Sequence, residues 1–177
     1  MHLLATLIGS AGIGYVNTNA GRKVYVCAEP QASALSQAQY EALTWVPVGG
    51  VGSHGETGSN TNILNYDTWD DEVTDKTKGM TNAGDPELEV AYRPEDDGQI
   101  VLRAAADTNF KYAFKIEGND RPNNDPDSTP TVRYNRGLVT GPRQPNGRNE
   151  DFQIDIFGLA LVQKQITVPA VDGTTTP

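Results

Sequence analysis

The chain has 177 residues and a net charge of −9, and 37 of its residues are Leu, Ile, Val or Phe. That length suits one domain with a modest core, because these four types make up about 21% of the chain, close to the level at which disorder becomes usual. The acidic balance argues against a sequence-independent nucleic-acid clamp, which needs a basic face against the phosphates. The single cysteine, Cys27, excludes an internal disulfide framework and a cysteine-based zinc site.

The apolar start of the chain, residues 1–9, carries no Lys or Arg and is short, so we expect no secretory signal. No stretch approaches the ~18 apolar residues that a membrane-spanning helix requires. After this start the chain becomes rich in Gly, Asn and Thr, which is typical of an extended arm. We therefore expect an N-terminal arm at 1–20, a β-domain at 21–168 and a C-terminal tail at 169–177.

Short runs of β-branched and aromatic residues, several of them alternating with polar ones, predict about seven strands. The strands are expected at 22–28, 44–48, 62–66, 87–92, 110–117, 131–140 and 150–162, with a short further one at 165–168. The alternation is cleanest in 110–117, where Phe110 is expected on the apolar face. Pro47 marks its strand as an edge or a bulge, because proline cannot donate a ladder hydrogen bond.

Residues 94–97, Pro-Glu-Asp-Asp, begin the best predicted helix, since proline in the first turn and acids at the positive end of the dipole are start signals. An apolar stripe follows, and the helix is expected to end near Asn109. A shorter helix is expected within 36–43. The Gly-rich stretch 49–62 predicts a flexible loop or an irregular strand entry, and 67–85 a long polar connection without structure. The class is mainly β: a sandwich or barrel with one flanking helix, long loops and an extended N-terminal arm.

No set of residues makes a convincing active site. The two histidines, His2 and His54, lie in the N-terminal arm and in the Gly-rich loop, where a general base would lack an orienting partner. The glycines at 9, 12 and 14 lack the Lys-Ser/Thr pair and the strand–loop–helix context of a phosphate-binding loop. We therefore predict neither an enzyme nor a cofactor.

Two stretches, 67–75 and 120–127, are rich in the oxygen-bearing side chains that bind Ca²⁺. Neither has the ligand order of an EF-hand loop, and Asp and Asn are also ordinary turn residues, so no metal is predicted. Trp69 lies in a polar stretch where its bulk needs a partner to cover it, which favours an interface. Trp45 is predicted either in the core or as an interface anchor.

The charge is unevenly spread along the chain. Residues 66–97 carry eleven acids and three bases, net −8, whereas 128–149 carry four arginines and no acid. The simpler interpretation is that both segments are solvent-exposed surfaces, as charged segments usually are. The sharper hypothesis is that the acidic stretch of one copy meets the arginines of another, which would fix the register of an oligomer.

An ordered set of motifs runs from Tyr66 to Ile116, over 51 of the 177 residues. Its pieces are Tyr66-Asp67-Thr68-Trp69-Asp70-Asp71-Glu72, Asn82-Ala83-Gly84-Asp85, Leu88-Glu89-Val90-Ala91-Tyr92-Arg93-Pro94, Asp97-Gly98-Gln99 and Tyr112-Ala113-Phe114-Lys115-Ile116. The set resembles the major tail tube protein of long-tailed, non-contractile bacteriophages of the lambda type. The flanking segments fit that family by architecture only.

The resemblance implies a structural protein that forms hexameric rings stacked into a tube. Its expected partners are other copies of itself, a tape measure protein inside the tube, and tail terminator and distal tail proteins. The expected location is the virion tail, after assembly in the host bacterial cytoplasm, with no membrane partner. The tube would conduct DNA into the host, and an acidic lumen would let the duplex pass without specific binding.

We expect 49–85 and the N-terminal arm to make contacts between rings. The predicted contact residues between rings or subunits are Tyr66, Asp67, Trp69, Asp70, Asp71, Glu72, Arg133 and Arg136. One alternative is another virion β-sandwich, such as a tail terminator, a distal tail ring or a decoration protein. A second is an extracellular β-sandwich module that binds carbohydrate or calcium. Polymerisation separates these alternatives, because a terminator stops at one ring and a ligand-binding module stays a monomer.

Overall fold

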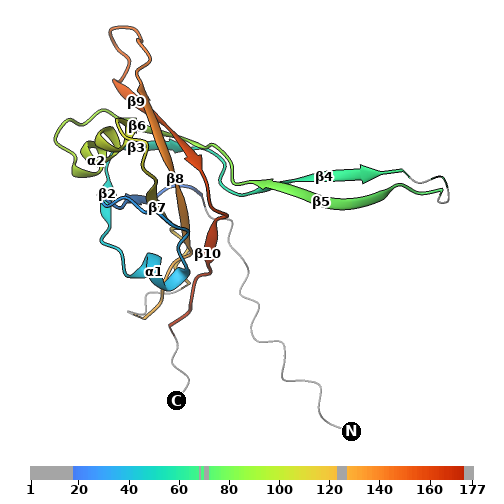
Figure 1. Ribbon diagram of the computed structural model, residues 1–177. Coiled ribbons are helices and arrows are strands. Elements are labelled where there is room, and N and C mark those ends of the chain that lie inside the picture. The colour runs from blue at the N-terminus through green and yellow to red at the C-terminus, as the bar shows by residue number, and fades with distance from the viewer. Residues whose placement is uncertain (1–17, 68, 70–71, 123–126, 174–177) are drawn as a thin grey trace.

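The computed structural model describes residues 18–67, 69, 72–122 and 127–173. An antiparallel eight-stranded sheet forms the body, and a separate two-stranded hairpin projects from it (Figure 1). The strands are β1 Lys23–Val26, β2 Val46–Val48, β3 Val51–His54, β4 Asn60–Tyr66, β5 Asp75–Asn82, β6 Glu87–Ala91, β7 Tyr112–Glu117, β8 Val132–Arg143, β9 Ile154–Leu161 and β10 Ile166–Val168. The helices are α1 Gln37–Glu41 and α2 Asp97–Ala106. The predicted class, mainly β with a flanking helix, is confirmed.

The body sheet has the strand order β2-β1-β7-β8-β9-β6-β3, with β10 paired to β8. Strands β2 and β3 lie at opposite ends of this order, yet only Gly49 and Gly50 separate them in the chain. Three residue steps span at most about 11 Å, so the sheet must curl until its two ends meet at this corner. Gly50 has φ of +73°, a backbone conformation that is open to glycine and strained for other residues.

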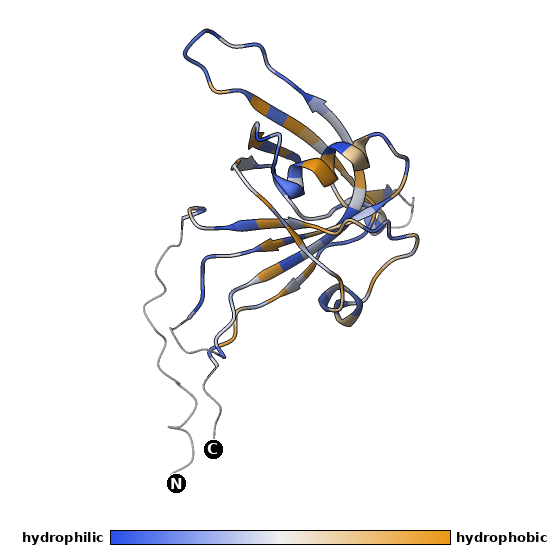
Figure 2. Cartoon of the chain, turned by 90° about the vertical axis from the view of Figure 1, so that its left-hand side faces the viewer, coloured by the Kyte–Doolittle hydropathy of each residue, from blue (hydrophilic) through white to orange (hydrophobic). Residues whose placement is uncertain are grey.

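The curled sheet encloses the main hydrophobic core, and α2 closes that core on one side. Leu102 and Ala105 of α2 are buried in the same cluster as Phe114 of β7 and Phe157 of β9. Full burial of a Leu or Phe side chain stabilises the fold by roughly 1.5–3 kcal/mol. Figure 2 shows hydrophobic and hydrophilic residues alternating along the strands of the body, as expected where one face of a strand is buried.

The start of α2 is tied to the corner between the two sheet ends. Asp96 caps the helix by accepting a hydrogen bond from the Gln99 amide nitrogen at 3.0 Å. The fully buried Gln99 side chain donates to the carbonyl oxygens of Gly49 and Ala91 at 2.9 and 2.8 Å, and accepts from the Arg93 amide at 2.9 Å. One amide side chain therefore joins α2, β6 and the β2–β3 corner, which gives a structural reason for the Gly-Gln motif.

A second, smaller cluster lies on the outer face of β7 and β8, under the segment that contains α1. The Tyr40 ring of α1 stacks on Tyr134 of β8 at a centroid distance of 5.0 Å. Trp45 stacks on the same ring at 6.0 Å and donates from Nε1 to the Tyr40 carbonyl oxygen at 3.2 Å. Burial raises the pKa of Tyr40 to about 12. Trp45 therefore packs against the core, which was one of its two predicted roles.

The prediction of an unstructured connection at 67–85 is wrong in part, because β5 occupies eight of its nineteen residues. β3 lies within 49–62, where a flexible loop or an irregular strand entry was expected, so the described residues form ten strands rather than about seven. The sequence of β5, Asp-Lys-Thr-Lys-Gly-Met-Thr-Asn, shows no alternation because neither face of the hairpin is covered by the body. Phe110 was also misplaced: β7 begins at Tyr112, and Phe110 is 61% exposed.

Residues 1–17, most of the predicted N-terminal arm, lie outside the described residues. In the predicted tail, Val171 pairs with Thr129 through two backbone hydrogen bonds of 3.0 Å, so the chain stays attached to the body beyond β10. No helix within the described ranges is long and apolar enough to cross a membrane.

Candidate assembly interface

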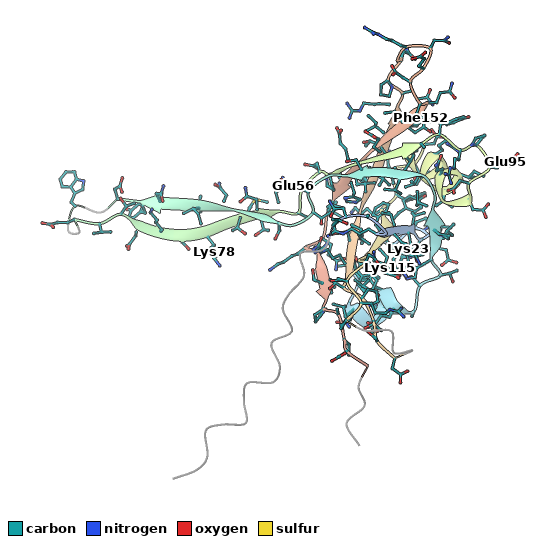
Figure 3. The ribbon with its side chains drawn as sticks, turned by 180° about the vertical axis from the view of Figure 1, so that it is seen from behind. Lys23, Glu56, Lys78, Glu95, Lys115 and Phe152 are labelled. Atoms are coloured by element: carbon teal, nitrogen blue, oxygen red, sulfur yellow. The ribbon has the colours of Figure 1, made fainter. Side chains whose placement is uncertain are left out.

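The β4–β5 hairpin stands away from the body as a long ribbon (Figures 1 and 3). Along its two strands every residue is exposed except Thr61 and Gly79, which are half-buried. An isolated two-stranded hairpin is at best marginally stable in water, because it has no third strand or helix to pack against. A ribbon of this kind indicates a surface that another molecule covers.

Large apolar side chains are exposed along this hairpin. Ile63 and Leu64 are each about half exposed, and Tyr66 and Met80 are 72% and 88% exposed. Trp69, in the turn, is fully exposed. Contiguous exposed apolar surface is rare on monomeric proteins and marks protein–protein contacts. The hairpin therefore has the composition of an interface.

The register of the hairpin divides its side chains between two faces. Ile63 lies opposite Lys78, and Asn65 lies opposite Lys76. Thr61 and Thr81 share their side, with their hydroxyl oxygens 2.8 Å apart. We call this the lysine face; its residues are Thr61, Ile63, Asn65, Lys76, Lys78 and Thr81.

The opposite side of the hairpin is more apolar. Leu64 lies opposite Thr77, and Tyr66 lies opposite Asp75. We call this the Leu64–Tyr66 face. The ribbon thus presents a cationic surface on one side and an aliphatic and aromatic surface on the other, so it can contact two different surfaces at once.

A groove of about 680 Å³ lies at the base of the hairpin. Four acids line it, Glu56, Asp85, Glu87 and Glu89, together with Ile156 of β9. The alternation of β6 buries Leu88 and Val90 and directs Glu87 and Glu89 to the outer side of the sheet. Glu87 pairs with Arg143, and the other three acids have no ion pair among the described residues. The groove is therefore an acidic surface of the body.

The predicted contact residues of the acidic stretch fall at the far end of the hairpin. Tyr66 ends β4, and Asp67, Trp69 and Glu72 are exposed beyond it. Asp70 and Asp71 lie outside the described residues.

The two predicted arginines lie on opposite faces of β8 and are not brought together. Arg136 is only 4% exposed, and its guanidinium donates to the carbonyl oxygens of Gln31 and Ala32 at 2.9 and 2.7 Å. These bonds hold the segment between β1 and α1 onto the sheet. Arg133 is half-buried and lines a hollow beside His54 and Arg22. Arg133 is thus the more accessible of the two.

His54 lies at the end of β3, where its ring is hydrogen-bonded to the backbone of its own chain. Its Nδ1 lies 2.8 Å from the Gly55 carbonyl oxygen, which suits a protonated Nδ1 as donor. Burial lowers the pKa of His54; the Gly55 hydrogen bond opposes this shift and the Arg22 charge adds to it. Within the described ranges no group of three or more His, Cys, Asp or Glu residues could hold a metal ion.

Sequence reasoning missed the lysine face because the residues of β5 were assigned to a loop, and it missed the groove because Glu56 and Asp85 come beside β6 only in the fold. One signal could have found the lysine face: the predicted strand at 62–66 needs a partner, and the following polar stretch is the nearest chain available. The strand expected at 150–162 begins only at Ile154, so Phe152 lies instead in the loop between β8 and β9, where it is 89% exposed (Figure 3).

No family model and no curated protein matches the chain. Several solved structures have the same fold. A chain from the structure of the anti-feeding prophage cap, the tube-terminating cap, matches with a TM-score of 0.64 at 12% identity, over 94% of this chain and 99% of that one. A chain from the sheath/tube terminator structure of the PVC extracellular contractile injection system matches with a TM-score of 0.62 at 12% identity, over 89% of this chain and 99% of that one. The SPP1 tail tube matches with a TM-score of 0.59 at 12% identity, over 86% of this chain and 78% of that one.

These likenesses confirm the part of the prediction that concerns the tail tube fold. They do not single out the lambda type, since the solved neighbours come from an injection system, a prophage and SPP1. At 12% identity the likeness is one of fold. We conclude that the chain has the fold of tail tube and tube-terminator subunits.

Proposed function

We propose that this chain is the structural subunit of a tail tube, whose copies form hexameric rings that stack into a hollow filament. The observation that carries the proposal is the β4–β5 hairpin, which stands clear of the body and exposes apolar side chains on both faces. In a monomer the apolar side chains of this ribbon stay exposed to water, whereas a stacked subunit can bury them against its neighbours. The shared fold with tube and terminator structures supports the same role.

The hairpin and the N-terminal arm of 1–20 make the contacts between rings in this proposal. Strands β2 and β3, which end the body sheet, gain partners or cover within the ring, because an unpaired sheet edge otherwise invites uncontrolled pairing. Tyr66, Asp67, Trp69, Asp70, Asp71 and Glu72 act at the far end of the hairpin. Arg133 meets acidic groups of a neighbouring copy, whereas Arg136 is already bonded inside its own chain.

The tube conducts DNA through an acidic lumen and is assembled around a tape measure protein, with terminator and distal tail proteins at its ends. The net charge of −9 supports this part of the proposal, because a basic lumen would retain a duplex through counterion release. The assembled tube belongs to the virion tail and forms in the host bacterial cytoplasm. No catalytic step is involved.

Negative-stain imaging of the purified protein tests the proposal directly. Hollow filaments built of stacked rings are the expected result. A monodisperse monomer at high concentration would contradict it. Single rings that do not stack would instead favour a tube terminator, the alternative that the anti-feeding prophage cap suggests.

A charge reversal tests the proposed arginine contact. Arg133→Glu should weaken tube formation at low salt and lose that effect at high salt, where exposed charges are screened. Normal tubes at both salt concentrations would refute the contact. Arg136→Glu is not a fair test, because it would leave a buried carboxylate against two carbonyl oxygens.

A further inference from the structure

We propose that the lysine face of the hairpin binds the outer face of β6 in an adjoining copy of this chain, with Lys76 and Lys78 opposite Glu87 and Glu89. The inference rests on the proposed function in one respect, namely that copies of the chain assemble. Beyond that function, the inference specifies which face of the hairpin makes the contact and which surface of the neighbouring copy receives it.

The lysines are free to serve an external partner. Lys76 and Lys78 are exposed, and neither makes an ion pair among the described residues. They are the only bases of β4 and β5, and both point to the same side of the ribbon. Figure 3 shows Lys78 out along the ribbon and Glu56 at its base, so the lysine face lies beyond the groove of its own chain.

The spacing of the two charge pairs is matched. Lys76 and Lys78 are two residues apart on one strand, as are Glu87 and Glu89 on another. Residues i and i+2 of a strand lie on the same face about 6.8 Å apart. A ribbon laid along β6 can therefore place each ammonium group opposite one carboxylate without distorting either strand.

Apolar groups accompany the charges on both surfaces. Ile63 lies directly opposite Lys78 on the lysine face. Ile156 of β9 lies directly opposite Glu89 in the body sheet and is half-buried in the groove. The two isoleucines thus hold comparable positions, each across from one charged residue, so docking would bury an aliphatic contact beside an ion pair.

The groove keeps a negative field even though Glu87 already pairs with Arg143. Glu56 and Asp85 stand beside β6 in the same groove, and neither makes an ion pair among the described residues. Complementary surface potentials of this kind set the orientation of partners and exclude wrong registers. The pairing would therefore fix how a hairpin is seated on its neighbour.

Paired charge reversals test the inference. Lys76→Glu with Lys78→Glu makes hairpin and groove both acidic, and Glu87→Lys with Glu89→Lys makes both basic. Each double variant should raise the critical concentration for tube formation at least about tenfold at low salt, since like charges then oppose each other. The quadruple variant should recover tube formation. Pelleting across a concentration series measures all three.

Mixing the two double variants gives a sharper test. Below its own raised critical concentration neither variant should polymerise alone, yet the acidic hairpin of one fits the basic groove of the other, and the reverse pair also matches. A mixture should therefore form tubes from rings that fail separately. Lys23→Glu, an exposed lysine on β1, is the matched control and should polymerise like the unaltered chain.

The outcomes separate the inference from the proposed function. Absence of tubes from the unaltered chain overturns the proposed function, and this pairing falls with it. Tubes that form equally well from the Lys76→Glu/Lys78→Glu variant overturn the pairing alone. A quadruple variant, or a mixture of the double variants, that forms tubes no better than each double variant alone also overturns the pairing. If the Glu87→Lys/Glu89→Lys variant does not fold by circular dichroism, Glu87→Gln/Glu89→Gln replaces it, and unchanged salt dependence of its assembly overturns the pairing.

Discussion

The body and the hairpin are stabilised in different ways. In the body, strands such as β6 and β9 bury alternate residues, and α2 is held by a fully buried glutamine with three backbone partners. In the two strands of the hairpin every residue but Thr61 and Gly79 is exposed, and the cross-strand ladder is their main internal support. The body can therefore fold alone, whereas the hairpin needs a neighbour to bury its apolar groups. Stability and assembly are thus assigned to separate parts of one chain, and the two can be perturbed independently.

Removal of the hairpin should have the largest effect on assembly and little effect on the body. Replacing 61–81 by Asn-Gly leaves Asn60 and Asn82 joined by a favoured two-residue turn. We expect no tubes by electron microscopy and a thermal midpoint within a few degrees of the unaltered chain. Tubes that survive the deletion would show that the body alone carries the ring contacts.

Gln99→Leu should lower the stability of the body, the part of the chain that the hairpin deletion leaves intact. The change leaves the Gly49 and Ala91 carbonyl oxygens and the Arg93 amide without their partner. Gly49 and Ala91 are half-buried, and a carbonyl group left unpaired in such a site costs up to roughly 1–3 kcal/mol, so the free energy of unfolding should fall by about 2 kcal/mol or more.

Urea unfolding measures this change, with Gln37→Leu as the control. Gln37 lies on α1 and its side chain makes a single exposed bond to Glu41, so its loss should cost less than about 0.5 kcal/mol. Equal losses in the two variants would mean that the Gln99 network does not hold the corner.

The Leu64–Tyr66 face should matter for assembly and not for folding. Leu64→Ser with Tyr66→Ser removes exposed apolar area, and we expect the critical concentration for tube formation to rise about tenfold. The urea midpoint should not move. Phe110→Ser, an exposed aromatic on the body, is the control; an equal effect there would show that the hairpin is not the preferred apolar contact.

The smallest expected effect is a pH dependence from His54. Its pKa is lowered in the folded state, so the unfolded chain binds a proton more readily. Stability from this group is therefore present above the unfolded value near 6.5 and declines as the pH falls below it. His54→Gln should flatten that part of the profile measured by thermal melts between pH 7 and pH 5. An unchanged slope would assign the loss to carboxylates instead.

Much of the fold could be predicted because burial leaves a pattern in the sequence. Strands with one buried face, such as β6 with Leu88 and Val90, alternate visibly, and α2 carries its own start signals. β5 could not be predicted this way, since a ribbon exposed on both faces imposes no alternation. Arg136 looked like surface charge because a sequence gives no sign that two backbone carbonyl groups will meet a guanidinium.

The contact residues were harder to predict than the strands for a related reason. Lys76 and Lys78 acquire a shared face only through the pairing of β5 with β4. The outward face of Glu87 and Glu89 follows from the alternation of β6, but the groove that adds Glu56 and Asp85 to them exists only in the folded chain. Composition located the acidic stretch 66–97. It could not show that the lysines in this stretch belong to the hairpin and that Glu87 and Glu89 belong to the body.

The pairing of β3 with β6 has one more consequence. These two strands are direct neighbours, with Val51 opposite Val90 and His54 opposite Leu88. In the topology of the body, everything from 55 to 86 is therefore one elaborate connection between adjacent strands. The projecting part of this connection, β4 and β5, can change in length by insertion or exchange, whereas Ala83 and Pro86 at its end stay packed on the body. A different hairpin, or a peptide cargo at its tip, can thus be grafted onto the same body, which would alter the repeat and surface of the proposed filament.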